Sequence, residues 1–191
     1  MAIRIAILAS GNGTNAENII RYFQERRTAE VALVLTNRAT AFVLQRAEKL
    51  GVPALCFSKE AWVDGQPVLD ALRAHDVGFV VLAGFLLRVP ANLIKAYPHR
   101  MVNIHPALLP KFGGKCMYGD HVHRAVLEAG EAESGITIHY VNEHYDEGAV
   151  IRQYRCPVMP GDTPETLAAR VHQLEYEHYP RLVEELVQAL G

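Results

Sequence analysis

"IRIAILASGNGTNAENIIRYFQER", residues 3–26, contains three consecutive features that decide the fold. Residues 3–8 form a short apolar run rich in isoleucine, residues 10–15 form a polar turn with two glycines, and the spacing of apolar residues over 16–27 is helical. A strand, a glycine turn and a helix in this order are the beginning of a βαβ unit.

The same alternation continues through the first hundred residues. Strand-like runs at 31–36, 54–57 and 79–83 are followed by helical segments at 41–50, 68–74 and 91–96, respectively. Alternation of this kind is typical of a parallel sheet covered by helices. The run "FVVLAGF", residues 79–85, is continuously apolar, so we expect a central strand that is buried on both faces.

The pattern changes after residue 100. A strand is expected over "MVNIH", residues 101–105, followed by a loop rich in proline and glycine over 106–119 and a helix over 121–129. Two further strand-like runs, "GITIHYV" and "GAVIRQYRCPV", are separated by "NEHYDE" and are expected to pair as antiparallel neighbours. The expected fold is therefore α/β and Rossmann-like: a mainly parallel sheet with helices on both faces and an antiparallel addition in the C-terminal half.

A long helix is expected to close the chain. Asp162 begins this segment, Pro164 suits its first turn, and Glu165 completes a D-x-x-E capping pattern. Because proline lacks the N–H that a helix needs, Pro180 should kink or divide the helix near Tyr179.

Composition limits the class of protein. The 191 residues include 19 Lys and Arg against 21 Asp and Glu, so the formal net charge is -2. This balance argues against a nucleic-acid or anionic-membrane partner. Cys56, Cys116 and Cys156 are odd in number and far apart, as expected for thiols in a reducing compartment. The first apolar run is too short for a signal peptide or a membrane span, and we expect a single cytoplasmic domain.

The glycine turn allows two interpretations with a ligand. Gly11-x-Gly13-x-x-Ala16 fits the dinucleotide fingerprint, but the strand that should end in an acidic residue ends in Thr36-Asn37-Arg38. Arg38 could meet a 2′-phosphate, which keeps an NADP-dependent reductase open. The alternative is a phosphate site, in which both glycines are free to take positive φ and the N–H groups of Gly13, Thr14 and Asn15 face the anion. A plain turn with Asn15 as helix cap is the interpretation without a ligand.

"MVNIHPALLP", residues 101–110, places two polar side chains in an apolar strand. Asn103 and His105 are two residues apart, so on a strand they face the same side, at the end where open α/β sheets bind ligands. An amide can donate to a developing oxyanion, and an imidazole can move a proton near neutral pH. A carboxylate beside the ring would hold its tautomer; Glu143, Asp146 and Glu147 are all candidates by sequence alone.

Histidine pairs suggest metal ligation only weakly. His121-x-His123 on a helix would place the two rings about 200° apart, and the pair His139 and His144 has no matching carboxylate spacing. We expect no metal.

With these motifs placed, the chain resembles the folate-dependent formyltransferase family, and within it the phosphoribosylglycinamide branch. "SGNGTN", "VVLAGF" and "NIHPALLP" carry the likeness, which extends over nearly the whole chain; NIHP-x-LLP is also shared with the methionyl-tRNA formyltransferases. The resemblance implies direct attack of the amine of glycinamide ribonucleotide on the formyl group of 10-formyltetrahydrofolate, in purine biosynthesis. It further implies two small-molecule substrates, a tetrahedral intermediate, no metal, and a monomer or homodimer.

The resemblance also implies roles for individual residues. The catalytic set would be Asn103, His105 and Asp146. The substrate phosphate and ribose would be bound by Gly13, Thr14, Asn15, His172 and Glu175. Folate would be bound by Leu86, Leu87, Arg88, Val89, Val141, Asn142 and Asn103. Residues 1–100 would then be the nucleotide-phosphate-binding half of one formyltransferase domain, and residues 101–191 its catalytic and folate-binding half.

Two segments depart from the family pattern. The loop Lys111–Gly119 is enlarged, and the segment 59–67 is shorter than usual, with no counterpart of a folate-contacting arginine. A third hypothesis, a sensor that binds nucleotide phosphate without catalysis, predicts ligand binding and no formyl product.

Overall fold

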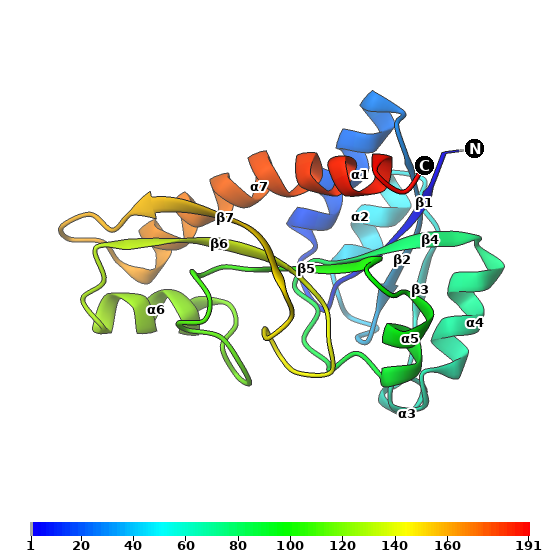
Figure 1. The fold of residues 1–191 in the computed structure, drawn as a ribbon, viewed down its shortest axis with the longest axis horizontal. Coiled ribbons are helices and arrows are strands. Elements are labelled where there is room, and N and C mark those ends of the chain that lie inside the picture. The colour runs from blue at the N-terminus through cyan, green and yellow to red at the C-terminus, as the bar shows by residue number, and fades with distance from the viewer. Residues whose placement is uncertain (1) are drawn as a thin grey trace.

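A computed structural model describes residues 2–191 (Figure 1). One sheet of seven strands runs through the molecule in the order β3-β2-β1-β4-β5-β6-β7. The strands are β1 (Arg4–Leu8), β2 (Glu30–Thr36), β3 (Ala54–Cys56), β4 (Val77–Leu82), β5 (Met101–His105), β6 (Glu133–Tyr140) and β7 (Val150–Pro157). The helices are α1 (Thr14–Arg26), α2 (Val43–Lys49), α3 (Lys59–Asp64), α4 (Gln66–Ala74), α5 (Ala91–Ala96), α6 (Asp120–Glu128) and α7 (Pro164–Gln188).

The first five strands are parallel and the last two are antiparallel, as expected. β1 pairs with β2 on one side and with β4 on the other, so the direction of winding reverses between β1 and β4. In open α/β sheets, ligands bind outside the carboxyl ends of the strands at such a reversal. The strand order therefore predicts a ligand-binding site outside the carboxyl ends of β1 and β4.

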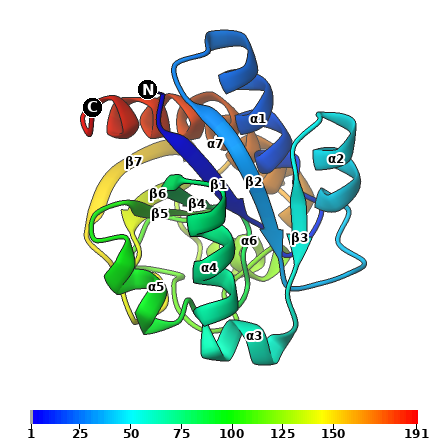
Figure 2. The same cartoon turned by 90° about the vertical axis from the view of Figure 1, so that its right-hand side faces the viewer.

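Helices cover both faces of the sheet (Figure 2), which confirms the expected fold class. Alternate residues of β1 point to opposite faces of the sheet. Ile5 and Ile7 pack with α1 and α7 on one face. Ala6 and Leu8 pack with α3, α4 and α5 on the other face. Each fully buried isoleucine or leucine contributes about 1.5–3 kcal/mol relative to an exposed one. Burial on both sides explains why the central strands are apolar throughout.

The long last helix differs from expectation at its start and at its proline. Its N-cap is Thr163, which forms a reciprocal capping box with Thr166, so the expected cap by Asp162 and Glu165 is wrong. Asp162 instead forms an ion pair with Arg170 at 2.7 Å. The helix also continues through Pro180 as one element to Gln188, and Pro180 does not divide it. Buried residues on both sides of Pro180 pack onto the sheet and compensate for the missing hydrogen bond.

Register aligns the strand ends around the reversal. Leu8 of β1 pairs with Leu82 of β4, and Leu82 pairs with Asn103 of β5. Asn103 in turn lies opposite His139 of the antiparallel strand β6. The glycine turn after β1, the loop after β4 and the polar residues of β5 and β6 therefore lie next to one another along one edge of the sheet.

Candidate active site

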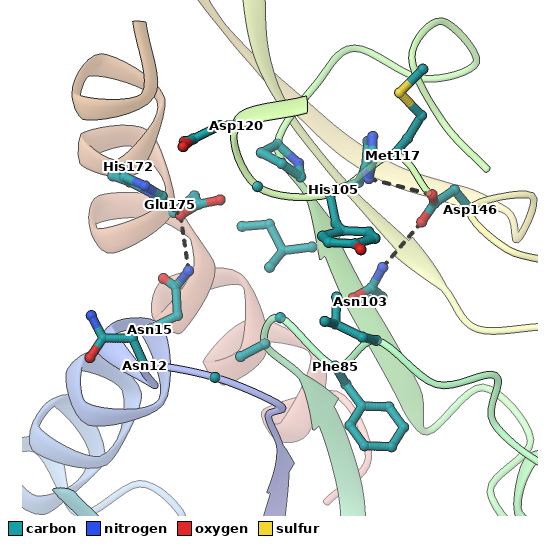
Figure 3. Close-up of a pocket in the computed structure, with 18 of the residues that line it drawn as sticks. Asn12, Asn15, Phe85, Asn103, His105, Met117, Asp120, Asp146, His172 and Glu175 are labelled. Atoms are coloured by element: carbon teal, nitrogen blue, oxygen red, sulfur yellow. Dashed lines mark hydrogen bonds and ion pairs between the residues drawn. The ribbon is translucent and has the colours of Figure 1, made fainter. Parts of the chain in front are cut away.

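A cavity of about 540 Å³ opens at these strand ends (Figure 3). The glycine turn and the loop after β4 form part of its wall, the end of β5 and the loop before α6 form another part, and α7 completes it. In Figure 3, Asn15 and Glu175 lie on one side of the cavity, and Asn103 and Asp146 lie on the opposite side. The residues expected from sequence to bind phosphate and to catalyse thus line one space.

Gly13 is the residue that shapes the turn. It is the N-cap of α1 and lies in the left-handed region, with φ 77°. A Cβ at this position would lie 2.4 Å from Cγ2 of Val43, at the start of α2, so packing as well as backbone conformation requires glycine. Of the two glycines that are free to take positive φ, only Gly13 does so. The free N–H groups of the first turn of α1 border the cavity, as an anion site requires.

Asn15 is held by α7 and is not a helix cap. Its Nδ2 donates to Oε2 of Glu175 over 2.9 Å, and the same carboxylate oxygen lies 2.7 Å from Nδ1 of His172. Glu175 is only 4% exposed, so these partners satisfy an otherwise costly buried charge. The hydrogen bond with Glu175 raises the pKa of His172 above its ordinary value. An acid and a histidine favoured in its charged form therefore lie beside the glycine turn.

Two residues that sequence reasoning did not select hold the turn in place. Nε of Arg46 donates to the carbonyl oxygen of Asn12 over 2.7 Å, and Nη2 donates to Asn12 Oδ1 over 2.9 Å, while the guanidinium also pairs with Glu17. Oγ of Ser10 accepts the N–H of Leu86 over 2.9 Å and so connects the turn to the loop after β4. Neither contact has a local sequence signal, because both join segments distant in the chain.

We predict that Arg46→Leu weakens the binding of a phosphate-bearing ligand about threefold to tenfold, because the lost hydrogen bonds to Asn12 are worth about 0.5–1.5 kcal/mol each. Arg21→Leu is the matched control, since Arg21 also pairs with Glu17, at 2.8 Å, but makes no hydrogen bond to Asn12. Titration calorimetry with a ribose 5-phosphate compound measures both. Equal dissociation constants in the two variants would show that Arg46 does not position the turn.

Asn103 and His105 project from β5 into the cavity on the same side, as their spacing requires. Asp146 meets both from the connection between β6 and β7: its Oδ1 accepts from Asn103 Nδ2 over 3.4 Å, and its Oδ2 lies 3.4 Å from His105 Nδ1. The residue itself is in the left-handed region, at φ 55°. Glu143 and Glu147, the other two acids of this connection, are exposed. The structure therefore singles out one of three carboxylates that the sequence left equivalent.

The hydrogen bonds of His105 define its tautomer. Nε2 lies 2.7 Å from the carbonyl oxygen of Phe112, which can only accept, so Nε2 carries a proton. Nδ1 then faces the carboxylate of Asp146 and is free to take up a second proton. The residue is 3% exposed, and burial lowers the pKa of His105, although the charge of Asp146 acts in the opposite direction. The ring is thus a neutral base at pH 7 with a carboxylate beside its free nitrogen.

Asp146 is held as a carboxylate by its polar neighbours. Burial acts to raise the pKa of Asp146, but His139, His105 and the N–H of Gly114 together outweigh it, so the pKa is lowered. The N–H of Gly114 donates to Oδ2 over 3.0 Å. A charged carboxylate at this point can stabilise an imidazolium at His105.

His139, which the sequence suggests only as a weak metal-ligand candidate, lies beside Asn103 and Asp146. Its Nδ1 donates to the carbonyl oxygen of Tyr140 over 2.8 Å, which leaves Nε2 to accept from Asn103 Nδ2 over 3.1 Å. The ring is buried and orients the amide of Asn103. The sequence does carry a signal for it: Thr137 and His139 are two polar residues, two apart, in the otherwise apolar run "GITIHYV", as Asn103 and His105 are in "MVNIH".

The loop Lys111–Gly119, expected to be enlarged, packs against His105 and Asp146. Phe112 supplies the carbonyl oxygen for His105 and Gly114 the N–H for Asp146, so the loop holds both through its backbone. Residues 114–119 also line the cavity. The loop is therefore part of the site wall, which the sequence could not show because backbone groups leave no residue signature.

The residues expected to bind folate divide between two adjoining spaces. Leu86 lines the main cavity. Leu87, Arg88, Val89, Val141 and Asn142 line a smaller cavity of about 60 Å³. Asn103, Tyr145 and Asp146 border both spaces. The smaller cavity is lined by both apolar and polar side chains and adjoins the main cavity beside Asn103 and Asp146.

In each histidine pair that could suggest a metal site, one residue is buried and the other is exposed. His123 and His139 are buried, whereas His121 and His144 are exposed. Over residues 2–191, no three side chains of His, Cys, Asp or Glu converge in a way that could hold a metal ion. Nor does any helix in that range have the length and apolar character to cross a membrane.

Known proteins match this chain along most of its length. The family model described as "Formyl transferase" matches residues 3–183. A chloroplastic phosphoribosylglycinamide formyltransferase of Arabidopsis thaliana is 42% identical over 94% of the chain, which spans 64% of that relative's length. The phosphoribosylglycinamide formyltransferase of Bacillus subtilis is 35% identical, with 96% of this chain and 94% of the relative covered.

Solved structures agree with the sequence matches. Glycinamide ribonucleotide transformylase 1 from Symbiobacterium toebii superimposes with a TM-score of 0.90 and 36% identity, covering 98% of this chain and 89% of that chain. The TM-score of 0.90 over 98% of this chain means that the two folds agree along nearly their whole length. The chain belongs to the formyl transferase family, in its phosphoribosylglycinamide formyltransferase branch.

Proposed function

We propose that this protein transfers the formyl group of 10-formyltetrahydrofolate to the amine of glycinamide ribonucleotide, in purine biosynthesis. The observation that carries the proposal is the pairing of Asn103, His105 and Asp146 at one end of a cavity whose other end is the N-terminus of α1. Membership of the phosphoribosylglycinamide formyltransferase branch supports it. Both substrates are small molecules.

The nucleotide is expected to bind along the long direction of the cavity. The N–H groups of Gly13, Thr14 and Asn15 would receive the phosphate, together with His172, because a helix N-terminus and an imidazolium both attract a dianion. Glu175, whose carboxylate borders the cavity, would accept hydrogen bonds from the ribose hydroxyls. This arrangement directs the glycinamide amine toward His105.

The folate would occupy the smaller cavity and its junction with the main one. Leu86 to Val89 would enclose it from the loop after β4, and Val141 and Asn142 from the end of β6. When bound there, 10-formyltetrahydrofolate supplies the formyl carbon beside Asn103. Residues from both halves of the chain thus serve each substrate, within one formyltransferase domain.

The catalytic residues would stabilise charge and move a proton. Attack by the amine places negative charge on the formyl oxygen. Asn103 can donate a hydrogen bond to this oxygen in place of its long 3.4 Å contact with Asp146. Nδ1 of His105 can take up the proton released by the attacking amine, and the carboxylate of Asp146 then stabilises the imidazolium. The intermediate would then collapse by breaking the bond between the formyl carbon and N10, with the imidazolium of His105 returning its proton to the leaving N10, so that no covalent enzyme intermediate is needed.

The charge of His172 predicts a pH dependence of nucleotide binding. Below its raised pKa, His172 is an imidazolium that attracts phosphate; as the pH rises through that pKa the charge is lost. A phosphate monoester becomes a dianion above about pH 6. Affinity should therefore rise to a maximum near neutral pH and fall by about threefold to tenfold on the alkaline side.

Calorimetric titrations of glycinamide ribonucleotide between pH 5.5 and 9 measure this dependence. His172→Gln keeps a polar side chain without the charge and should flatten the alkaline decrease. If the variant and the wild type lose affinity in parallel, the charge of His172 does not contribute to binding.

One assay distinguishes this proposal from the two alternatives. The purified protein is incubated with both substrates, and formylglycinamide ribonucleotide is measured by mass spectrometry, with NADPH binding measured in parallel. Formyl product without NADPH binding is the expected result. Binding of NADPH without product would support the reductase suggested by Gly11-x-Gly13-x-x-Ala16 and Arg38, and nucleotide binding without product would support a sensor.

A further inference from the structure

His123 is a buried histidine in the cavity wall that the proposed mechanism does not use. It lies on α6, is 2% exposed and borders the main cavity. Its Nδ1 is fully buried and makes no hydrogen bond within residues 2–191. Buried polar atoms in folded proteins are nearly always paired, so an unpaired nitrogen beside a ligand cavity calls for an explanation.

The environment of the ring favours a neutral form with its proton on Nε2. Burial lowers the pKa of His123, and the neighbouring His172, whose ring centroid is 6.3 Å away, acts in the same direction. A neutral imidazole has one donor and one acceptor nitrogen. Leaving an acceptor unpaired at Nδ1 costs less than leaving a buried N–H there, so the N–H belongs on Nε2. We infer that this N–H is available to the cavity.

The position of His123 indicates which part of the ligand it meets. The titratable neighbours that shift the pKa of His123 include His172, Glu175, Asp120 and His105. Glu175 belongs to the ribose end of the cavity and His105 to the reacting end (Figure 3). In glycinamide ribonucleotide, an amide and one methylene group lie between the ribose and the attacking amine, and the amide carbonyl oxygen is an acceptor.

We propose that His123 is a further substrate-binding residue, which donates a hydrogen bond from Nε2 to the amide carbonyl oxygen of glycinamide ribonucleotide. This inference depends on the proposed function, because it assigns one contact of that substrate. The contact would fix the rotation of the glycinamide arm and so direct the amine to the formyl carbon. It would also distinguish the substrate from ribose 5-phosphates that lack the amide.

Three variants of His123 test the contact. His123→Gln places a donor near the position of Nε2, His123→Asn places its amide near the position of Nδ1, and His123→Leu removes both nitrogens. Calorimetry gives the dissociation constants for glycinamide ribonucleotide and for ribose 5-phosphate, which has no amide. The leucine and asparagine variants should bind glycinamide ribonucleotide about tenfold more weakly, the glutamine variant within about threefold of wild type, and all three should bind ribose 5-phosphate normally.

The melting temperature and the ring tautomer provide checks that a packing role would not satisfy. His123→Leu should not melt below wild type, because it removes an unpaired buried nitrogen. Nitrogen-15 NMR of labelled protein should show a neutral ring protonated on Nε2, with its proton resonance displaced by glycinamide ribonucleotide and not by ribose 5-phosphate.

The outcomes separate this inference from the proposed function. Unchanged affinity for glycinamide ribonucleotide in the leucine variant, an equal loss for ribose 5-phosphate, or a proton on Nδ1 would each overturn the assignment of His123 while leaving formyl transfer by the wild type intact. Absence of formyl transfer by the wild type would overturn the proposed function itself.

Discussion

Replacing His105 with alanine is expected to lower kcat for formyl transfer by about 10³-fold, the usual range for loss of a positioned acid–base group. The ring is neutral, has a free Nδ1 beside Asp146, and lies on the wall of the cavity where the reaction is placed. The nucleotide should still bind, because Gly13 and Glu175 lie at the opposite end. Steady-state kinetics and calorimetry on the same preparation separate the two effects.

Asp146→Asn tests the same proton transfer by changing the carboxylate that lies beside the His105 ring. The carboxylate raises the pKa of His105, so its removal should lower that pKa further and move the acid limb of the residual rate to lower pH. Glu147→Gln is the matched control, since Glu147 is the next residue and exposed. A variant at Asp146 that keeps the wild-type rate and pH profile would contradict the proposed role of the pair.

Gly148→Ala should be the most disruptive substitution outside the catalytic group. A Cβ on Gly148 would lie 1.6 Å from the carbonyl oxygen of Tyr140, so the backbone must move. The same carbonyl oxygen accepts a hydrogen bond from the ring Nδ1–H of His139, and Asp146 lies two residues before Gly148 in the chain. Overpacking of this kind costs about 1–3 kcal/mol of stability, and a displacement of about 1 Å at the site can lower the rate by about 100-fold.

Thermal unfolding and kinetics of Gly148→Ala should therefore both change, with Ala149→Ser as the exposed neighbouring control. If the variant is less stable but its rate falls only in proportion to the fraction of protein that is unfolded, the β6–β7 connection does not position Asp146. Retention of both would show that the strand pair can relax around the added methyl group.

The features that could be predicted from sequence are those set by neighbouring residues. The continuous apolar runs identified the buried parallel strands, the glycine turn after β1 located the start of α1, and the spacing of Asn103 and His105 placed both on one side of β5. Each depends on a repeat of two or of about 3.6 residues, or on the special conformation of glycine.

The features that could not be predicted depend on contacts between distant segments. Choosing Asp146 over Glu143 and Glu147 requires the path of the β6–β7 connection, and the backbone partners in the loop Lys111–Gly119 require its fold. Arg46 supports the glycine turn from α2, thirty-four residues along the chain from Asn12. At the start of α7, Asp162 could not be distinguished from Thr163 as the cap, because both residue types are good N-caps.

The central claim is that Asn103, His105 and Asp146 promote direct transfer between two substrates bound at the two ends of one cavity. A single-turnover experiment with excess protein and carbon-13 formyl-labelled 10-formyltetrahydrofolate tests it most directly, with the label followed by rapid quench and mass spectrometry. The account predicts that the label passes to glycinamide ribonucleotide in one kinetic phase, with none on the protein at any time. Label that accumulates on the protein, or appears only as free formate, would contradict it.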